Sequence, residues 1–243
     1  MRKYEIVNAL IARHRYRRYL EICTPSTGFR FSQIQHPRLH WRHRLIYRCP
    51  PRFQDGSEIT FRSADDQISH LLDPALPYDI IFVDPHHTFE CSMRDLQSAL
   101  AMLRPEGTIV VHDCSPTSKE LAGPSFRPGG WFGVTYCAYI EFVLSHPDLI
   151  YYTVDTDCGC GVIKKASPSR AATSKSGRYH ELARLWRLER SQQHDMFDFF
   201  RQRRHALLNL ISVKEFLIHE KVRLSGLSRL SQWRDSVAAL LQT

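Results

Sequence analysis

Two short polar sequences, each directly after an apolar run, hold the residue types that acid–base or metal chemistry needs. The first is Asp84-Pro85-His86-His87, which follows the apolar residues 80–83, and the second is His112-Asp113-Cys114, which follows residues 108–111. Imidazoles exchange protons near neutral pH, and carboxylates can hold a divalent cation. These groups can act together only if the chain brings them to one place.

The residues between the two polar sequences predict how they meet. The apolar runs 80–83 and 108–111 are typical of strands buried on both faces. Residues 88–103 carry apolar side chains at helical spacing, and Pro105-Glu106-Gly107 ends that helix. A strand–helix–strand unit of this length indicates parallel neighbours with a right-handed crossover. Both polar sequences should therefore lie at the carboxyl edge of one sheet, where ligands bind in open α/β sheets.

The same reasoning predicts further elements along the chain. A helix is expected over residues 4–14, a short helix over 64–72 and a helix over 131–145. Besides the two strands above, we expect strands at 19–23, 44–49, 58–63, 149–155 and 159–164. The last two flank a short polar connection and indicate an antiparallel hairpin. The fold class is therefore α/β, a Rossmann-like sheet of seven strands, with five strands alternating with helices and a closing hairpin.

The C-terminal third has a different composition. Residues 166–177 are rich in Ser, Ala and Lys, as in a linker, and residues 178–243 show large apolar side chains at near-helical intervals. We predict a first domain over 1–165, a linker over 166–177 and a helical extension over 178–243. The extension is too apolar to remain disordered, so it should pack on the domain or on a second copy of the chain.

Charge is distributed unevenly. Residues 63–165 carry 6 basic and 14 acidic residues, whereas the two ends are basic and give the whole chain its net charge of +8. Basic ends can meet nucleic acid or an anionic surface, but a solvated helical face is the simpler interpretation. No apolar run reaches membrane-spanning length, and the N-terminus does not lead into a signal-peptide core. We expect a cytoplasmic protein without a transmembrane segment.

Four sequence blocks together resemble a known family. They are YLEICTPSTG at 19–28, YDIIFVDPHH at 78–87, GTIVVHDCSP at 107–116 and VDTDCGCGVIK at 154–164. In this order and spacing they resemble class I S-adenosylmethionine-dependent methyltransferases, and most closely the bacterial branch that acts on small molecules. The resemblance covers about residues 4–165 and implies a Rossmann-like methyltransferase sheet with S-adenosylmethionine as cofactor.

The resemblance also implies roles for single residues. The turn after the first strand would hold the methionine part of the cofactor, and a group after the third strand would face the adenine. Asp84 and His86 would lie near the methyl donor. The residues implied for cofactor binding are Glu21, Thr24, Ser26, Thr27, Gly28, Ser63, Asp65, Asp84 and His86. Glu21 has a structural alternative, because a carboxylate inside an apolar strand needs a partner, and Arg44 or Arg17 could provide one.

Methyl transfer to a hydroxyl group requires that a proton be removed. We predict His112, next to Asp113, as the base, with His87 as the second candidate; hydrogen bonding within a loop is the alternative for each histidine. Asp84 and Asp113 end neighbouring strands and could hold Mg²⁺ together with acceptor oxygens.

Three functional hypotheses remain open from the sequence. The first is O-methylation of a small hydroxylated acceptor, such as a sugar or a natural-product intermediate. The second is a binding or assembly module of the same fold without catalysis, and it takes account of Cys23 where the family favours glycine. The third, a nucleic-acid methyltransferase, is disfavoured because no Asn-Pro-Pro-Tyr-type motif for a flipped base is present. The helical extension also raises the possibility of a homo-oligomer.

Overall fold

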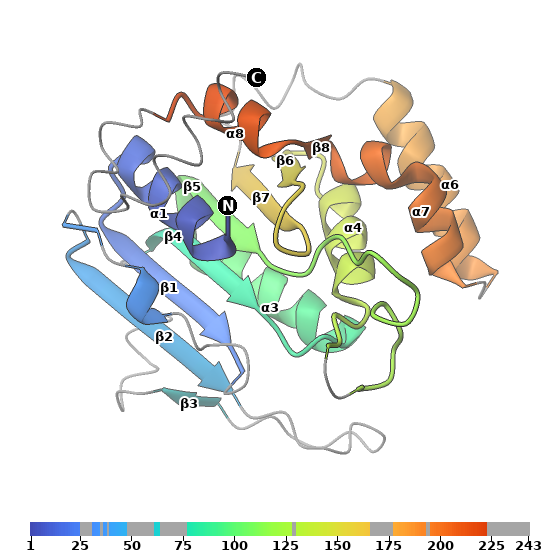
Figure 1. Ribbon diagram of the computed structural model, residues 1–243, viewed down its shortest axis with the longest axis horizontal. Helices are drawn as coiled ribbons and strands as arrows, with labels where there is room; N and C mark the ends of the chain where they lie inside the picture. Colours follow the sequence, from blue (N-terminus) through green and yellow to red (C-terminus); the bar gives the residue numbers. More distant parts are fainter. Residues whose placement is uncertain are drawn as a thin grey trace.

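The computed structural model describes residues 1–24, 31–34, 36–37, 39–47, 61–63, 77–127, 130–165, 177–192 and 195–222. These residues form one mixed sheet with helices on both faces (Figure 1). The strands are β1 (Arg18–Cys23), β2 (Trp41–Tyr47), β3 (Phe61–Ser63), β4 (Tyr78–Asp84), β5 (Leu103–Val111), β6 (Leu149–Val154), β7 (Cys160–Lys165) and β8 (Leu210–Ile211). The helices are α1 (Lys3–His14), the 3₁₀ turn η1 (Phe31–Gln33), α3 (Phe89–Met102), α4 (Thr135–Ser145), α6 (Gly177–Ser191), α7 (Met196–Leu208) and α8 (Val213–His219).

The strand order is β3-β2-β1-β4-β5-β7-β6-β8. Strands β2, β1, β4 and β5 run parallel, and β7 lies antiparallel between β5 and β6. The expected sheet of seven strands is therefore present, with β6 and β7 as the closing hairpin. One expectation was wrong: β3 pairs antiparallel with β2 instead of continuing the alternation of parallel strands and helices. An antiparallel neighbour does not need the helical crossover that a parallel one requires.

Alternate residues of the strands divide the core into two layers. One face of β1, β4 and β5, with Ile22, Val83 and Val111, packs against α3, α4, α6 and α7. The opposite face, with Tyr19 and Phe82, packs against α1 and α8. Because side chains alternate along a strand, each buried strand contributes to both layers, and this explains the continuous apolar runs in the sequence. Helix α1 thus lies across the sheet face beside β4 and β5 (Figure 1).

Helix boundaries in two parts of the chain have local causes. The helix expected from residue 131 begins at Thr135, because Gly133 has φ +55°, a left-handed conformation that cannot continue a helix. The helical extension predicted over 178–243 begins with two separate helices, α6 and α7. Asp195 caps the start of α7 by accepting a hydrogen bond from the Phe197 amide, and Asn209 ends it in the left-handed region.

The tail packs on the sheet and also extends it. Strand β8 pairs parallel with β6, and α7 buries Phe200, Leu207 and Leu208 in the same layer as α4. Helix α8 buries Phe216 and Leu217 beside α1 in the other layer. Of the two alternatives for the apolar tail, packing on the domain or on a second copy of the chain, the described helices of the tail therefore adopt the first. The expected short helix over 64–72, most of the linker over 166–177 and residues 223–243 of the predicted extension lie outside the described residues.

Candidate functional site

The two polar sequences meet at the carboxyl edge of the sheet, as predicted. Asp84 is the last residue of β4, and His112 and Asp113 directly follow β5. Val83 pairs with Val111, and the His112 amide donates a hydrogen bond to the Val83 carbonyl at 3.0 Å. The register therefore places the first polar side chains of both strands side by side, close to Cys23 at the end of β1, which pairs with Asp84.

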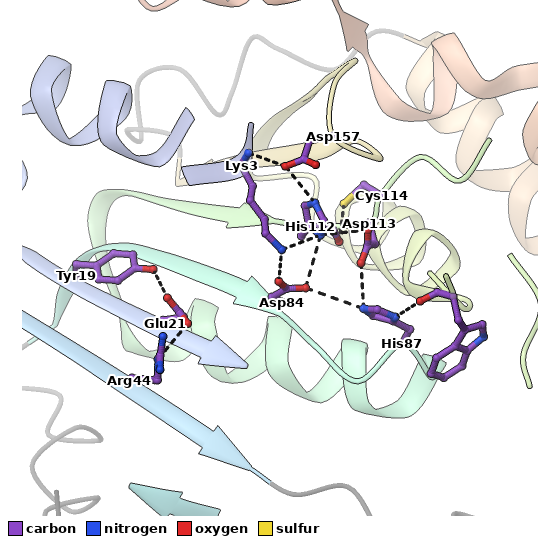
Figure 2. Close-up of polar contacts among 11 residues, drawn as sticks. Lys3, Tyr19, Glu21, Arg44, Asp84, His87, His112, Asp113, Cys114 and Asp157 are labelled. Atoms are coloured by element: carbon purple, nitrogen blue, oxygen red, sulfur yellow. Dashed lines mark hydrogen bonds and ion pairs between the residues drawn. The ribbon is translucent and has the colours of Figure 1, made fainter. Parts of the chain in front are cut away.

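Asp84 lies at the centre of this group and is 1% exposed. Its Oδ2 accepts a hydrogen bond from the Lys3 ammonium at 2.6 Å, and its Oδ1 lies 3.6 Å from His112 Nδ1 and 4.0 Å from His87 Nε2. Lys3 comes from the first turn of α1, so the N-terminal helix reaches the strand-end edge (Figure 2). A buried carboxylate requires compensating partners, and these three cationic side chains provide them.

Asp113 connects the two histidines. Its Oδ2 lies 3.0 Å from His87 Nε2, and its Oδ1 lies 3.1 Å from His112 Nδ1. The residue has φ +59°, which is uncommon for any residue with a side chain, although aspartate is among the residue types that adopt it most readily. Backbone held in such a conformation is frequent at functional sites, where it orients a side chain in a direction that an extended backbone would not allow.

His87 is fixed by the segment that precedes α4. Its Nδ1 donates to the Trp131 carbonyl at 2.5 Å, and its own carbonyl accepts from the Val134 amide at 2.9 Å. A Cβ atom on Gly133 would lie 2.0 Å from the His87 carbonyl oxygen, so only glycine permits this approach. With Nδ1 committed to a carbonyl acceptor, Nε2 is the nitrogen that faces Asp84 and Asp113 (Figure 2).

The hairpin between β6 and β7 closes the group from the other side. Asp157 Oδ2 lies 3.6 Å from His112 Nε2 and accepts the Lys3 backbone amide at 2.8 Å. The hairpin is attached to the chain after β5, because the Cys114 amide donates to the Gly159 carbonyl at 3.1 Å and the Ser115 amide to the Cys158 carbonyl at 2.8 Å. Asp157 is thus held at the same edge as Asp84.

The carboxylates control the charge of both histidines. Burial alone would lower the pKa of His112, but Asp113, Asp84 and Asp157 outweigh it and raise the pKa of His112 well above its ordinary value. At His87, burial likewise lowers the pKa, but Asp113 and Asp84 outweigh burial and raise the pKa to about 9. The carboxylates therefore favour the protonated, imidazolium form of both rings.

The histidines and Lys3 act in the opposite direction on the carboxylates. Burial would raise the pKa of Asp84, but His112, His87 and Lys3 hold it well below its ordinary value. The pKa of Asp157 falls to about 2 because His112 and Lys3 outweigh its burial. With Asp113 also ionised, three carboxylates face three cations, and the group is balanced in charge.

Three buried atoms of this group have ion-pair partners but no well-aligned hydrogen bond among the described residues. His87 Nε2, His112 Nε2 and Asp113 Oδ1 lie in ion pairs, but none of them makes a hydrogen bond of acceptable geometry with the described residues. Buried polar atoms in this condition are costly unless a further partner completes them. A hydroxyl-bearing ligand at the edge could provide that partner.

The Glu21 carboxylate is paired with side chains of the protein, as the structural alternative predicted. It is 2% exposed; Tyr19 donates a hydrogen bond to its Oε2 at 2.9 Å, and Arg44 Nε lies 3.1 Å from its Oε1. Figure 2 draws this trio apart from the Asp84 group, along β1 and β2. Of the two arginines considered, Arg44 is the partner, because β1 and β2 are in register and Glu21 pairs with Arg44 across them.

The other predicted site residues have different positions. His86 is half-buried, with its ring 5.4 Å from that of Trp131. Thr24 is buried directly after β1, and Ser63 ends β3. Ser26, Thr27, Gly28 and Asp65 lie outside the described residues. The structure therefore unites Asp84, His87, His112 and Asp113, and leaves the cofactor turn undescribed.

A divalent cation at Asp84 and Asp113 can be tested against these contacts. Ligand atoms of Asp84, His87 and Asp113 all lie within 4.8 Å of one another, which is close enough for metal binding. However, the Lys3 ammonium already occupies Asp84 Oδ2, and His87 Nε2 carries a proton, whereas a metal ligand must have a free electron pair. Mg²⁺ also demands near-octahedral oxygen ligands. The side chains as they stand do not fit a resident Mg²⁺.

Sequence reasoning missed two members of the group, Lys3 and Asp157. Asp157 lies in the short polar connection that predicts the β6–β7 hairpin, and its position next to the sheet edge is the signal that could have identified it. Lys3 had none, because it is one of many basic residues near the N-terminus. Both positions depend on long-range packing, since 81 positions separate Lys3 from Asp84.

The strand order and the antiparallel β7 are those of the Rossmann-like methyltransferase sheet predicted from the sequence. Residues 8–114 match the family model described as a methyltransferase domain, and this segment contains β1, β4 and β5 with the predicted site. The matched segment is 107 of the 243 residues, so the similarity to a methyltransferase domain applies to this part of the chain.

Three solved structures with a similar arrangement are the following. A Staphylococcus aureus protein assigned provisionally as a caffeoyl-CoA O-methyltransferase is 13% identical, with a TM-score of 0.46 over 67% of this chain and 82% of that one. Cofactor-bound Rv0187 from MTB is 17% identical, with a TM-score of 0.41 over 66% and 78%. The O-methyltransferase TomG from Streptomyces achromogenes, in complex with SAM, is 16% identical, with a TM-score of 0.41 over 67% and 79%. No curated protein is significantly similar in sequence.

The search for membrane-spanning helices was negative. Among the described residues, no helix combines the length and the apolar character that crossing a bilayer requires.

Proposed function

We propose that this protein transfers the methyl group of S-adenosylmethionine to a hydroxyl group of a small acceptor, such as a sugar or a natural-product intermediate. The observation that carries the proposal is the convergence of Asp84, His87, His112 and Asp113 at the carboxyl edge of β4 and β5, next to the end of β1. In a sheet of this topology, that edge is where a nucleoside cofactor binds.

The cofactor would lie across the ends of β1 and β4. Thr24, Ser26, Thr27 and Gly28 would surround its methionine part, since a turn of small residues allows backbone amides to approach a ligand. Ser63 and Asp65 would face the adenine, and Asp84 and His86 the region of the methyl donor. Glu21 would act on this turn only indirectly, because its carboxylate is already bound by Tyr19 and Arg44.

The acceptor hydroxyl would bind beside the paired His112 and Asp113, near His112 Nε2. Its oxygen would attack the methyl carbon of the sulfonium in line, so that the O–CH₃ bond forms as the S–CH₃ bond breaks and S-adenosylhomocysteine leaves. Holding both reactants at this geometry can supply roughly 7–11 kcal/mol of the barrier. The hydroxyl proton passes to the His112–Asp113 pair. Since His112 holds its own proton tightly, only the neutral fraction of this imidazole acts as base, but that fraction is a strong one.

His87 has a supporting role in this scheme. Its imidazolium, held between the Trp131 carbonyl and Asp113, places a positive charge beside the position where negative charge develops on the acceptor oxygen. Preorganised charge of this kind stabilises a transition state without reorganisation at the moment of reaction. The contacts of Lys3 and His87 argue against the Mg²⁺ hypothesis, so we derive no step through a metal.

Two other functions fit less well. A nucleic-acid methyltransferase would have to bind a polyanion beside residues 63–165, a segment with 14 acidic and 6 basic residues. A module that has lost catalysis would have no need for two histidines and two carboxylates gathered at the ligand-binding edge of the sheet. A homo-oligomer formed through the tail remains a prediction; Leu188 and Ile218 are the exposed apolar side chains on α6 and α8 that it could use.

Isothermal titration calorimetry with S-adenosylmethionine and S-adenosylhomocysteine tests the proposal first. We expect saturable binding of both to the folded protein. A panel of sugars, phenols and hydroxylated amino acids, assayed for S-adenosylhomocysteine release, then identifies the acceptor class. Binding of neither compound would reject cofactor use. Transfer that is retained in His112→Ala and Asp113→Ala would reject the assigned base.

A further inference from the structure

The ammonium of Lys3 lies inside the acid–imidazole group and not on the surface. Its Nζ lies 2.6 Å from Asp84 Oδ2, 3.5 Å from His112 Nδ1 and 5.9 Å from the centre of the Phe82 ring. The side chain is only 17% exposed. Figure 2 shows it descending from α1 onto Asp84, between the ends of β4 and β5.

The backbone of Lys3 is held as firmly as its side chain. Its amide donates to Asp157 Oδ2 at 2.8 Å, and the neighbouring Met1 carbonyl accepts a hydrogen bond from Thr156 Oγ1. The rest of α1 is anchored by Ile6 and Leu10, both fully buried against the sheet. The ammonium is therefore a preorganised part of the edge, unlike the end of a flexible surface lysine.

Lys3 competes directly with a divalent cation for this place. Asp84, His87 and Asp113 are spaced as metal ligands, yet one of the two Asp84 oxygens, Oδ2, is already bound to the ammonium. A cation bound to the other Asp84 oxygen would have to lie beside both the ammonium and His112. Like charges at such distances in a buried site repel strongly.

We propose that Lys3 is a positioning residue that serves as the resident cation of this site. Its ammonium holds the Asp84 carboxylate and occupies the place that a divalent metal would otherwise take. The N-terminal helix is then part of the active site, and methyl transfer proceeds without a divalent metal. The role in methyl transfer rests on the proposed function, whereas the exclusion of metal from Asp84 does not.

Mn²⁺ binding, followed by electron paramagnetic resonance of the free ion, tests the proposal without cofactor or acceptor. Failure here is therefore distinguishable from failure of the proposed function. We expect wild-type protein to bind no Mn²⁺ through Asp84. Lys3→Met keeps the length of the side chain and removes its charge, and it should bind Mn²⁺ roughly tenfold or more tightly than wild type. Adding Asp84→Asn to that variant should abolish the gain.

Two control variants complete the design. Lys3→Arg keeps the positive charge and should gain no Mn²⁺ site. Lys164→Met removes an ammonium of similar exposure, 21%, from a single buried carboxylate, Glu220, and should also gain none. Circular dichroism verifies folding, and Lys3→Gln replaces Lys3→Met if the latter does not fold.

Three outcomes would overturn the proposal. The first is wild-type protein that binds Mn²⁺ and loses it in Asp84→Asn. The second is a folded Lys3→Met or Lys3→Gln variant that gains no Mn²⁺ binding. The third is a gain that persists when Asp84→Asn is added.

Discussion

Lys3 Nζ and Asp84 Oδ2 lie 2.6 Å apart, although 81 positions separate the two residues in the chain. This contact joins the N-terminal helix to the end of a central strand. Around it, Asp84 also faces His112 and His87, so one buried carboxylate serves three cations. The stability of the edge and its chemistry therefore depend on the same side chain.

Replacing Asp84 by asparagine should lower the free energy of unfolding by about 3 kcal/mol, because removing one partner of a buried ion pair leaves the others uncompensated. Urea unfolding at neutral pH measures the change. Asp198→Asn is the matched control: Asp198 pairs with Arg201 on the exposed side of α7, and its loss should cost no more than about 0.5 kcal/mol. Equal stability of the two variants would contradict the central position of Asp84.

Gly159→Ala should lower the free energy of unfolding by more than about 1 kcal/mol. Gly159 has φ +84°, and a Cβ atom there would lie 2.4 Å from Ser115 Cβ. The substitution would push the hairpin away from the chain after β5. Gly123→Ala is the control, since its nearest contacts would be 4.0 Å away and its stability should be unchanged. Thermal unfolding compares the two, and a Gly159→Ala protein as stable as wild type would show that the hairpin is not fixed there.

Glu220 should make stability depend on pH in acid. Its side chain, 3% exposed, lies 2.8 Å from His14 Nε2 and 2.5 Å from Lys164 Nζ. Burial would raise the pKa of Glu220, but His14, Lys164 and Tyr152 lower it from 4.5 to about 2. A lowered folded-state pKa means that the stabilisation is complete above pH 4.5 and is lost as pH falls towards 2. The contribution is about 3 kcal/mol at most.

The difference between wild type and Glu220→Gln isolates this effect from other titrating groups. Urea unfolding at pH 5 and pH 3 should give a larger stability difference between the two proteins at pH 5. Glu181→Gln, at an exposed pair with Arg184, should give nearly equal differences at both pH values. A pH-independent difference for Glu220→Gln would contradict the assignment.

Asp113→Asn should reduce the rate of methyl transfer roughly 10²-fold or more while leaving S-adenosylmethionine affinity unchanged. Asparagine tolerates φ +59°, so the backbone can remain in place while the carboxylate that faces both histidines is lost. Single-turnover assays and calorimetry measure the two quantities. Asp195→Asn, which caps α7 away from this edge, should leave the rate unaffected. If Asp113→Asn weakened cofactor binding and left the rate intact, the residue would belong to the cofactor site instead.

Several features of this protein followed from the sequence alone. Buried strands appear as continuous apolar runs, and parallel strands joined by a helix must end at the same edge of the sheet. The sequence alone therefore predicts that Asp84, His112 and Asp113 lie together. The choice between cofactor and arginine at Glu21 was also defined in advance, because a carboxylate in an apolar strand requires a partner. Local periodicity and strand direction are properties of short segments, and the sequence carries them explicitly.

Tertiary structure decided which distant residues complete that edge. Lys3 approaches Asp84 because α1 packs across the sheet face, and Asp157 approaches His112 because the β6–β7 hairpin is attached to Ser115 and Cys114. The antiparallel β3 and the additional strand β8 likewise depend on which strand edge was free to pair. Such contacts arise from packing between segments far apart in the chain, and neither residue type nor spacing encodes them locally.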